Sequence, residues 1–176
     1  MKLKSTVAAA LLAVFGAGSA NAANTDWFLH DYPNAEIGFN IVTGGFWDNY
    51  SFSMPVGFNL VAGVAVANNN GNVILINNGQ FALYSNADNI IGNGDDALIS
   101  PWWAYNGSTG ATQHSVNLTA GNYYYAVKGV GAGIGEQGLY TLTSQITPVP
   151  EPETYALMLA GLAAVGFIAR RRSSKA

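Results

Sequence analysis

Alternation of apolar and polar side chains along short stretches is the feature that most constrains this fold. Residues 46–54 place on one side of an extended chain Phe46, Asp48, Tyr50, Phe52 and Met54. Side chains alternate between the two faces of a β-strand, so this stretch predicts a strand with a mainly apolar face on which Asp48 is the exception. The body of the chain shows no convincing amphipathic helix. The sequence therefore predicts an all-β fold.

Further short stretches of the same kind predict more strands. These are residues 58–66, 97–99, 102–105, 113–118, 123–129 and 139–146. Residues 73–76 and 80–84 flank Asn77-Asn78-Gly79, and Asn-Gly favours tight turns, so we expect a hairpin there. Short strands separated by turns rich in glycine and asparagine predict an antiparallel β-sandwich or jelly-roll-like domain.

The C-terminal end has a different pattern. Val149-Pro150-Glu151-Pro152-Glu153-Thr154 precedes an apolar run from Tyr155 to Ala169, which ends in Arg170, Arg171 and Arg172. We expect a transmembrane helix over residues 154–169, with the arginines as a cytoplasmic stop signal under the positive-inside rule. At 1.5 Å per residue the apolar run spans roughly 22 Å, short of the roughly 30 Å hydrocarbon core, so the predicted anchor is marginal.

This order of elements resembles the PEP-CTERM sorting signal of Gram-negative bacteria, with Pro150, Glu151 and Pro152 as its triplet and the arginines near the chain end. The resemblance, over residues 148–176, implies handling by an exosortase, a membrane enzyme thought to cut near the triplet as the protein leaves the inner membrane. The same tail carries the label of an ice-binding protein C-terminal domain, which describes the tail and is no evidence of ice binding by the body. An ordinary single-pass anchor that is never cut is the alternative.

The N-terminal end has the layout of a secretory signal peptide. Lys2 and Lys4 precede an apolar run at residues 7–15 and a small-residue site, Ala20-Asn21-Ala22. We predict a signal peptide over residues 1–22, cut by signal peptidase after Ala22. A start-transfer anchor that stays in place is the alternative. The remaining secreted domain, the body of the chain, covers residues 23–147.

Charge restricts the partners of this body. Between residues 23 and 150, eight acidic residues stand against a single basic residue, Lys128. Phosphate binding requires a basic face, so nucleic-acid binding is excluded. An acidic polysaccharide would need a bridging divalent cation or aromatic stacking. The chain has no cysteine, which excludes disulfides, thiol catalysis and Cys-based zinc sites.

Two internal segments carry a further resemblance. Phe46, Asp48 and Tyr50 resemble the Phe-x-Asp-x-Phe signature of one PEP-CTERM subfamily, with Tyr50 in the third position. Residues 118–129, followed by residues 138–140, are similar to the closing hairpin of those proteins. That subfamily brings no biochemical activity with it. Asp48 itself is predicted to accept structural hydrogen bonds, with metal ligation as the alternative.

Candidate chemistry is sparse elsewhere. Asp88, Asp95 and Asp96 supply oxygen ligands of the kind calcium favours, but they lack the EF-hand spacing, and a solvated turn is the alternative. His30 and His114 are the only histidines, and no Gly-x-Ser-x-Gly elbow is present, so we expect no nucleophilic catalysis. Paired carboxylates for glycoside hydrolysis depend on the fold and cannot be singled out.

Aromatic residues are numerous in the body. Trp102 and Trp103 are adjacent, so in a strand they point to opposite faces and at most one of them lies in the core. Exposed rings would allow sugars to stack, with Trp102 and Trp103 as candidates, whereas buried rings would only fill the interior.

These observations predict an exported, non-catalytic protein of the cell surface or exopolysaccharide matrix, as in a biofilm. The alternatives are a carbohydrate-binding module that uses exposed aromatics and a secreted hydrolase. The expected partners are signal peptidase, an exosortase, exopolysaccharide and, transiently, the inner membrane. We expect no required cofactor, and calcium is the candidate ion.

Overall fold

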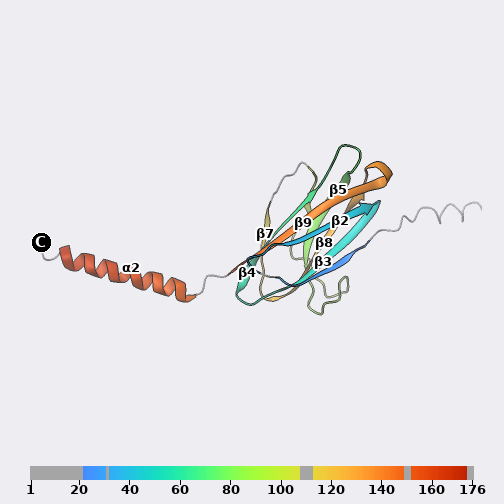
Figure 1. Cartoon of the computed structure of the whole chain (residues 1–176). Helices are drawn as coiled ribbons and strands as arrows, with labels where there is room; N and C mark the ends of the chain where they lie inside the picture. Colours follow the sequence, from blue (N-terminus) through green and yellow to red (C-terminus); the bar gives the residue numbers. More distant parts are fainter. Residues whose placement is uncertain (1–21, 31, 108–112, 149–151, 174–176) are drawn as a thin grey trace, which may run out of the picture.

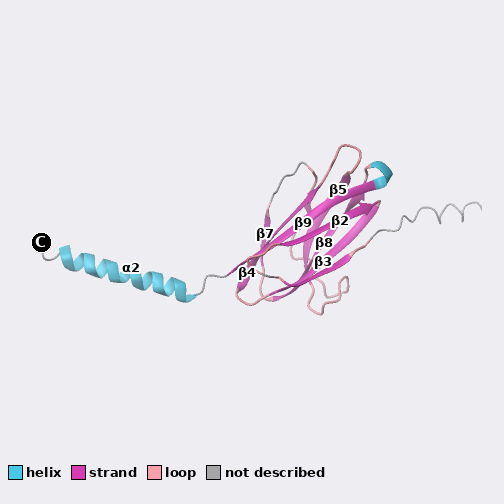
Figure 2. Cartoon of the chain, viewed as in Figure 1, coloured by secondary structure: helices cyan, strands magenta, loops and turns pink. Residues whose placement is uncertain are grey.

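The structure is a computed structural model that describes residues 22–30, 32–107, 113–148 and 152–173 of the 176-residue chain. Strands make up most of the body and one long helix follows it (Figures 1 and 2). The strands are β1 Asn24–Leu29, β2 Glu36–Thr43, β3 Gly45–Met54, β4 Phe58–Ala67, β5 Ile76–Ser85, β6 Trp103–Ala104, β7 His114–Asn117, β8 Gly121–Gly131 and β9 Gln137–Pro148. A short 3-10 turn, η1 Ile134–Glu136, connects β8 to β9. The all-β prediction is confirmed for the body.

The strands form two sheets. One has the order β1-β3-β8-β5-β6 and the other β2-β9-β4-β7. Every pairing between these strands is antiparallel except that of β1 with β3, which is parallel. The inner faces of the two sheets pack on each other through a core rich in tyrosine and phenylalanine, which includes Phe52, Phe81, Tyr125, Tyr140 and Leu142. The core buries the face on which the sequence placed Phe46, Tyr50, Phe52 and Met54.

The predicted hairpin around Asn77-Asn78-Gly79 is wrong. Residues 76–85 form one strand, β5, whose register against β8 shifts between Asn77 and Gln80. Asn78 has a positive φ of 54°, so the local left-handed geometry is present but serves a bulge rather than a turn. Gly79 is required there, because a Cβ would lie 2.7 Å from the carbonyl oxygen of Tyr105.

The sequence analysis did not anticipate β1 and β2. β2 is an edge strand whose outer positions are apolar, with Ile37, Phe39 and Ile41 all exposed. An apolar outer face obscures the alternation that marks a half-buried strand. The short segment 97–99 contributes only an isolated bridge between Tyr84 and Leu98.

One α-helix is present among the described residues, α2 Pro152–Ser173, which follows the body and lies apart from the sheets in Figure 1. Its described side chains are all exposed. Across the described residues, no helix combines enough length with enough hydropathy to cross a membrane. The predicted helix over residues 154–169 lies within α2. Arg171 and Arg172 continue the helix after Arg170.

Parts of the predicted processing signals fall outside the described residues. These parts are residues 1–21, including Ala20, together with Pro150 and Glu151. Ala22 is described and exposed, and Pro152 begins α2.

Candidate functional site

One row of outward-pointing residues crosses the outer face of the five-stranded sheet. Trp47 on β3 pairs with Lys128 on β8, and Lys128 pairs in turn with Gln80 on β5. Because paired residues point to the same face, an indole, an amine and an amide lie next to one another. Trp47 is 40 % exposed, and its indole N–H donates to the side-chain oxygen of Asn49 at 3.0 Å. The indole N–H lies in the plane of the ring, so this hydrogen bond fixes the ring without covering either of its faces.

Trp102 completes this group from the segment before β6. Its ring lies edge-on to that of Trp47, with centroids 5.4 Å apart. The Nζ atom of Lys128 is 3.8 Å from the Trp102 centroid and 5.4 Å from the Trp47 centroid. Both distances allow a cation–π interaction. The only basic residue of the body therefore lies against two indoles, and we call Trp47, Trp102 and Lys128 the indole–lysine cluster.

A shallow hollow of about 370 Å³ adjoins this cluster. Its lining includes Trp47 and Lys128, the side chains of Asn78 and Gln80, and the apolar Val130. Such a lining combines a ring and an aliphatic surface with three polar groups able to bond hydroxyls. We call this the aromatic hollow.

Trp103 points the other way. Its ring stacks on His114 with centroids 4.5 Å apart and packs against Phe81 of the core. The prediction that at most one of the two neighbouring tryptophans belongs to the core is confirmed. Of the two candidates for sugar stacking, only Trp102 lies in the indole–lysine cluster.

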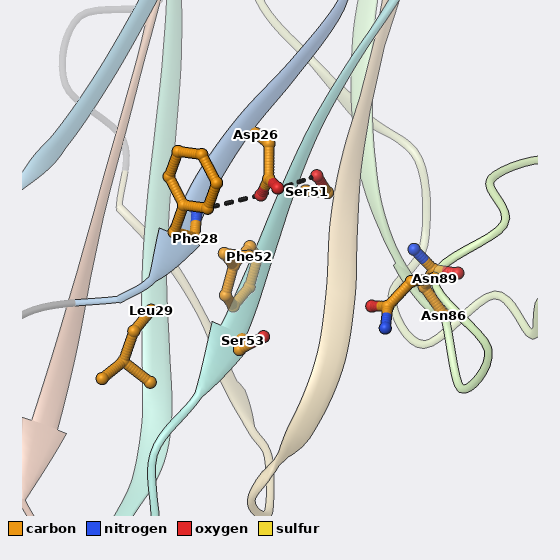
Figure 3. Close-up of a pocket in the computed structure, with 8 residues that line it drawn as sticks. All are labelled: Asp26, Phe28, Leu29, Ser51, Phe52, Ser53, Asn86 and Asn89. Carbon is orange, nitrogen blue, oxygen red and sulfur yellow. Dashed lines mark hydrogen bonds between the residues drawn. The ribbon is translucent and has the colours of Figure 1, made fainter.

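A second hollow, of about 480 Å³, lies at the other end of β3 (Figure 3). It is lined by Asp26, Phe28, Leu29, Ser51, Phe52, Ser53, Asn86 and Asn89. Asp26 Oδ1 accepts hydrogen bonds from the Phe28 amide at 2.9 Å and the Ser51 hydroxyl at 3.1 Å. Phe28 has a φ of 58°, which is unusual for a bulky residue, and its ring is exposed. This hollow combines hydrogen-bonding and apolar groups and has no tryptophan in its lining.

Asp48 is fully buried on the inner face of β3, at 0 % exposure. Its Oδ2 accepts from the Tyr140 hydroxyl at 2.6 Å and from Asn40 Nδ2 at 2.9 Å, and its Oδ1 accepts from the backbone N–H of Ala23 at 2.9 Å. Because the proton of Tyr140 is directed to Asp48, the 2.8 Å contact between the Tyr50 and Tyr140 hydroxyls has Tyr50 as its donor.

This network explains the Phe46-x-Asp48-x-Tyr50 pattern structurally. All three side chains surround Tyr140: Phe46 stacks on its ring at 5.4 Å, whereas Asp48 and Tyr50 bond its hydroxyl. Burial, followed by hydrogen bonds to Asp48 and Tyr50, raises the pKa of Tyr140 well above its ordinary value. The cluster is inaccessible to a ligand, so its arrangement favours a structural role for these residues.

Two of the three predicted calcium ligands, Asp88 and Asp96, accept hydrogen bonds from other groups of the protein. Asp88 accepts from Asn93 Nδ2 at 2.8 Å, and Asp96 accepts from the Gly92 amide at 2.6 Å and from the Tyr124 hydroxyl at 3.1 Å. Within the described ranges, no three acidic, histidine or cysteine side chains come together as a metal site. The structure therefore does not group Asp88, Asp95 and Asp96 into such a site.

His30 is hydrogen-bonded to Ser144, with 2.9 Å between Nε2 and Oγ. Sequence reasoning did not pair these residues, which are 114 positions apart. Both are only 1 % exposed, and the Tyr125 hydroxyl lies 3.1 Å from the same Oγ. A substrate carbonyl could not reach this serine without opening the core, so the pair has the geometry of a packed polar contact.

Sequence reasoning named Trp102 as a candidate for sugar stacking but did not join it to Trp47 or Lys128. The signal was available only in part: β3 and β8 were both predicted, yet their pairing register cannot be derived from periodicity alone.

Several solved structures resemble the fold distantly. PliG of Aeromonas hydrophila, a periplasmic inhibitor of g-type lysozyme, is 14 % identical with a TM-score of 0.47, over 73 % of this chain and 100 % of that one. The mitogen of Yersinia pseudotuberculosis is 12 % identical with a TM-score of 0.42. The match covers 68 % of this chain and 92 % of that one. CorA, a surface-associated copper-binding protein of Methylomicrobium album BG8, is 10 % identical with a TM-score of 0.39, over 73 % and 100 %. At such scores the likenesses carry no functional information.

A comparison with curated proteins found no match. A family model does match the C-terminal end: residues 148–172 correspond to the PEP-CTERM protein-sorting motif. This confirms the sorting signal predicted around Pro150, Glu151 and Pro152. The chain therefore carries the signal of an exported protein that is processed by an exosortase after membrane-anchored transit.

Proposed function

We propose that the body is a non-catalytic polysaccharide-binding domain that works at the cell surface or in the extracellular matrix, and that it binds sugar at the aromatic hollow. One observation carries the proposal: an exposed indole, a half-buried indole and the body's only basic side chain meet beside an open hollow. The sorting motif supports the export that this role requires.

The chemistry of the hollow suits a sugar. Pyranose rings present apolar C–H faces and polar edges, so a binding site needs a flat ring together with hydrogen-bonding side chains. Trp47 offers the ring, and Asn78, Gln80 and Lys128 offer amide and ammonium groups around it. The shallow shape suits a chain that lies on the surface.

The charge of the hollow's lining affects which polymers can bind there. The body is strongly acidic, but the lining of the aromatic hollow includes Lys128 and no carboxylate. An acidic polymer repelled by the rest of the surface would meet a cation here, whereas a neutral polymer would depend on stacking and hydrogen bonds.

Affinity electrophoresis of the exported protein tests this function. The gels contain either a neutral polymer, hydroxyethyl cellulose, or an acidic one, alginate, at increasing concentration. We expect retardation by at least one polymer, and we expect Trp47→Ala to weaken it about tenfold or more, as removal of a central tryptophan commonly does.

The matched control is Phe39→Ala. Phe39 is an aromatic residue that is 70 % exposed on β2, in the other sheet. Equal losses in the two variants would indicate nonspecific adsorption, and an unchanged Trp47→Ala protein would rule out the aromatic hollow as the binding site.

A further inference from the structure

Asp48 is a buried carboxylate for which the body has no lysine or arginine partner. The body's only residue of either type, Lys128, stacks over Trp102 on the outer face of the sheet, whereas Asp48 faces the core. The donors that contact Asp48 are all neutral in the unprocessed chain: a phenol, an amide side chain and a backbone N–H. A buried carboxylate without a countercharge is strongly unfavourable, so this site lacks an electrostatic partner.

The backbone nitrogen that contacts Asp48 belongs to Ala23. Its distance from Oδ1 is 2.9 Å. On the other side of the same residue, the Ala23 carbonyl accepts from the Asn49 amide at 2.7 Å, and Asn49 Nδ2 donates to the Asn24 side chain at 2.8 Å. These three hydrogen bonds fix the start of β1 on β3, so the Ala23 nitrogen has a defined place beside the carboxylate.

The sequence before Ala23 supplies a reason for this arrangement. Ala20-Asn21-Ala22 has the small residues that signal peptidase requires, and it would be cut at the bond between Ala22 and Ala23. In that hydrolysis water adds across the amide: the hydroxyl goes to the Ala22 carbonyl carbon, which becomes a carboxylate, and the Ala23 nitrogen leaves as an amine that takes up a proton.

We propose that the Ala22–Ala23 bond is the maturation site of this chain, and that the α-ammonium group freed there is the counter-ion of Asp48. The nitrogen already in contact with Oδ1 then acquires a positive charge. A charge-assisted hydrogen bond is shorter and stronger than a neutral one, and it is strongest where water is excluded. Cleavage therefore supplies the buried Asp48 carboxylate with a counter-ion as well as releasing the chain.

This inference depends on the identity of one nitrogen atom. A cut one residue earlier or later would place the ammonium group roughly 3.8 Å along the chain from its position at Ala23. The inference does not depend on sugar binding, because the aromatic hollow lies on the opposite face of the sheet.

The first test is the intact mass of the exported full-length chain, recovered from a host with signal peptidase. We expect the chain to begin at Ala23. A different first residue would overturn the proposal.

The second test moves the charge without removing the carboxylate. One glycine is inserted between Ala22 and Ala23, so that the processed chain carries its ammonium one residue too early, and its unfolding in urea is followed by tryptophan fluorescence. We expect the unfolding equilibrium constant to rise 10- to 100-fold, within the range of measured coupling between contacting groups.

Asp48→Asn provides the matched background. In the Asp48→Asn chain the same insertion should change the unfolding constant less than threefold, because no carboxylate remains to be paired. Equal effects of the insertion in the two backgrounds would overturn the proposal.

A third measurement remains informative if Asp48→Asn fails to fold. Acetylation of the α-amine by an activated ester, followed by mass spectrometry, should be at least tenfold slower in the native chain than in the insertion variant. Equal rates would show that the amine is not held by Asp48 and would overturn the proposal.

Discussion

The hydroxyl of Tyr140 donates a 2.6 Å hydrogen bond to Oδ2 of Asp48, although the two residues lie 92 positions apart. Tyr140 belongs to β9 and Asp48 to β3, so this bond connects the two sheets through the core. Both side chains have 0 % exposure. A buried hydrogen bond to a charged group contributes more than a neutral one, and an unpaired partner loses its solvation as well.

Tyr140→Phe should therefore destabilise the body by about 1.5–3 kcal/mol, since it removes the donor and leaves the carboxylate less well solvated. The control is Tyr125→Phe, which removes a buried hydroxyl that bonds only the neutral Ser144. We expect about 1 kcal/mol for the control. Urea unfolding measures both, and a loss for Tyr140→Phe no larger than the control's would contradict a charged partner.

Alkaline pH should unfold the body cooperatively. Burial is the main cause that raises the pKa of five tyrosines, namely Tyr50, Tyr105, Tyr124, Tyr125 and Tyr140. Their pKa is higher in the folded than in the unfolded state, so their contribution is complete below about pH 10 and is lost as the pH rises further. Tyr105, Tyr125 and Tyr140 can each contribute up to about 1.4 kcal/mol per pH unit in that range.

The measurement is a titration followed by tyrosinate absorbance and circular dichroism on the same sample. We expect these five of the nine tyrosines to ionise together with the loss of β-structure. Ionisation of all nine before any change in circular dichroism would contradict the buried network.

The sequence predicted the central strands better than the edges. Residues 46–54 alternate apart from Asp48 and residues 58–66 are mainly apolar, and β3 and β4 form there. β2 was missed because it carries Ile37, Phe39 and Ile41 on its outer face, against the usual polar exterior of an edge strand. The Asn77-Asn78-Gly79 turn signal was present, but tertiary pairing of β5 with β8 extended the strand through it.

The candidate site was predictable as a set of residue types rather than as a place. Neighbouring Trp102 and Trp103 had to diverge, and they do. The contact between Lys128 and Trp102 depends on the path of the segment before β6 across the sheet. A local sequence pattern does not predict that path. The contact between the Ala23 nitrogen and Asp48 likewise depends on the parallel pairing of β1 with β3, which the sequence did not predict.

Lys128→Met should weaken the indole–lysine cluster. The change keeps the aliphatic stem but removes the cation that lies 3.8 Å from the Trp102 centroid. We expect a loss of about 0.5–1 kcal/mol in unfolding free energy, the usual size of a partly exposed cation–π contact. Lys128→Arg is the matched control and should retain most of it. Thermal unfolding checks both variants, and a fully stable Lys128→Met protein would show that the contact contributes nothing.

Gly38 on β2 should resist enlargement because the ring of Tyr50 packs directly against it. A Cβ at this position would collide with Cε1 of that ring. Gly38→Ala should therefore cost about 1–3 kcal/mol through overpacking, and displacement of Tyr50 would also weaken its bond to Tyr140. Gly45→Ala on β3 is the control, because nothing lies within 4 Å of its Cβ position. Urea unfolding compares the two, and a Gly38→Ala protein as stable as Gly45→Ala would mean that Tyr50 can move without loss.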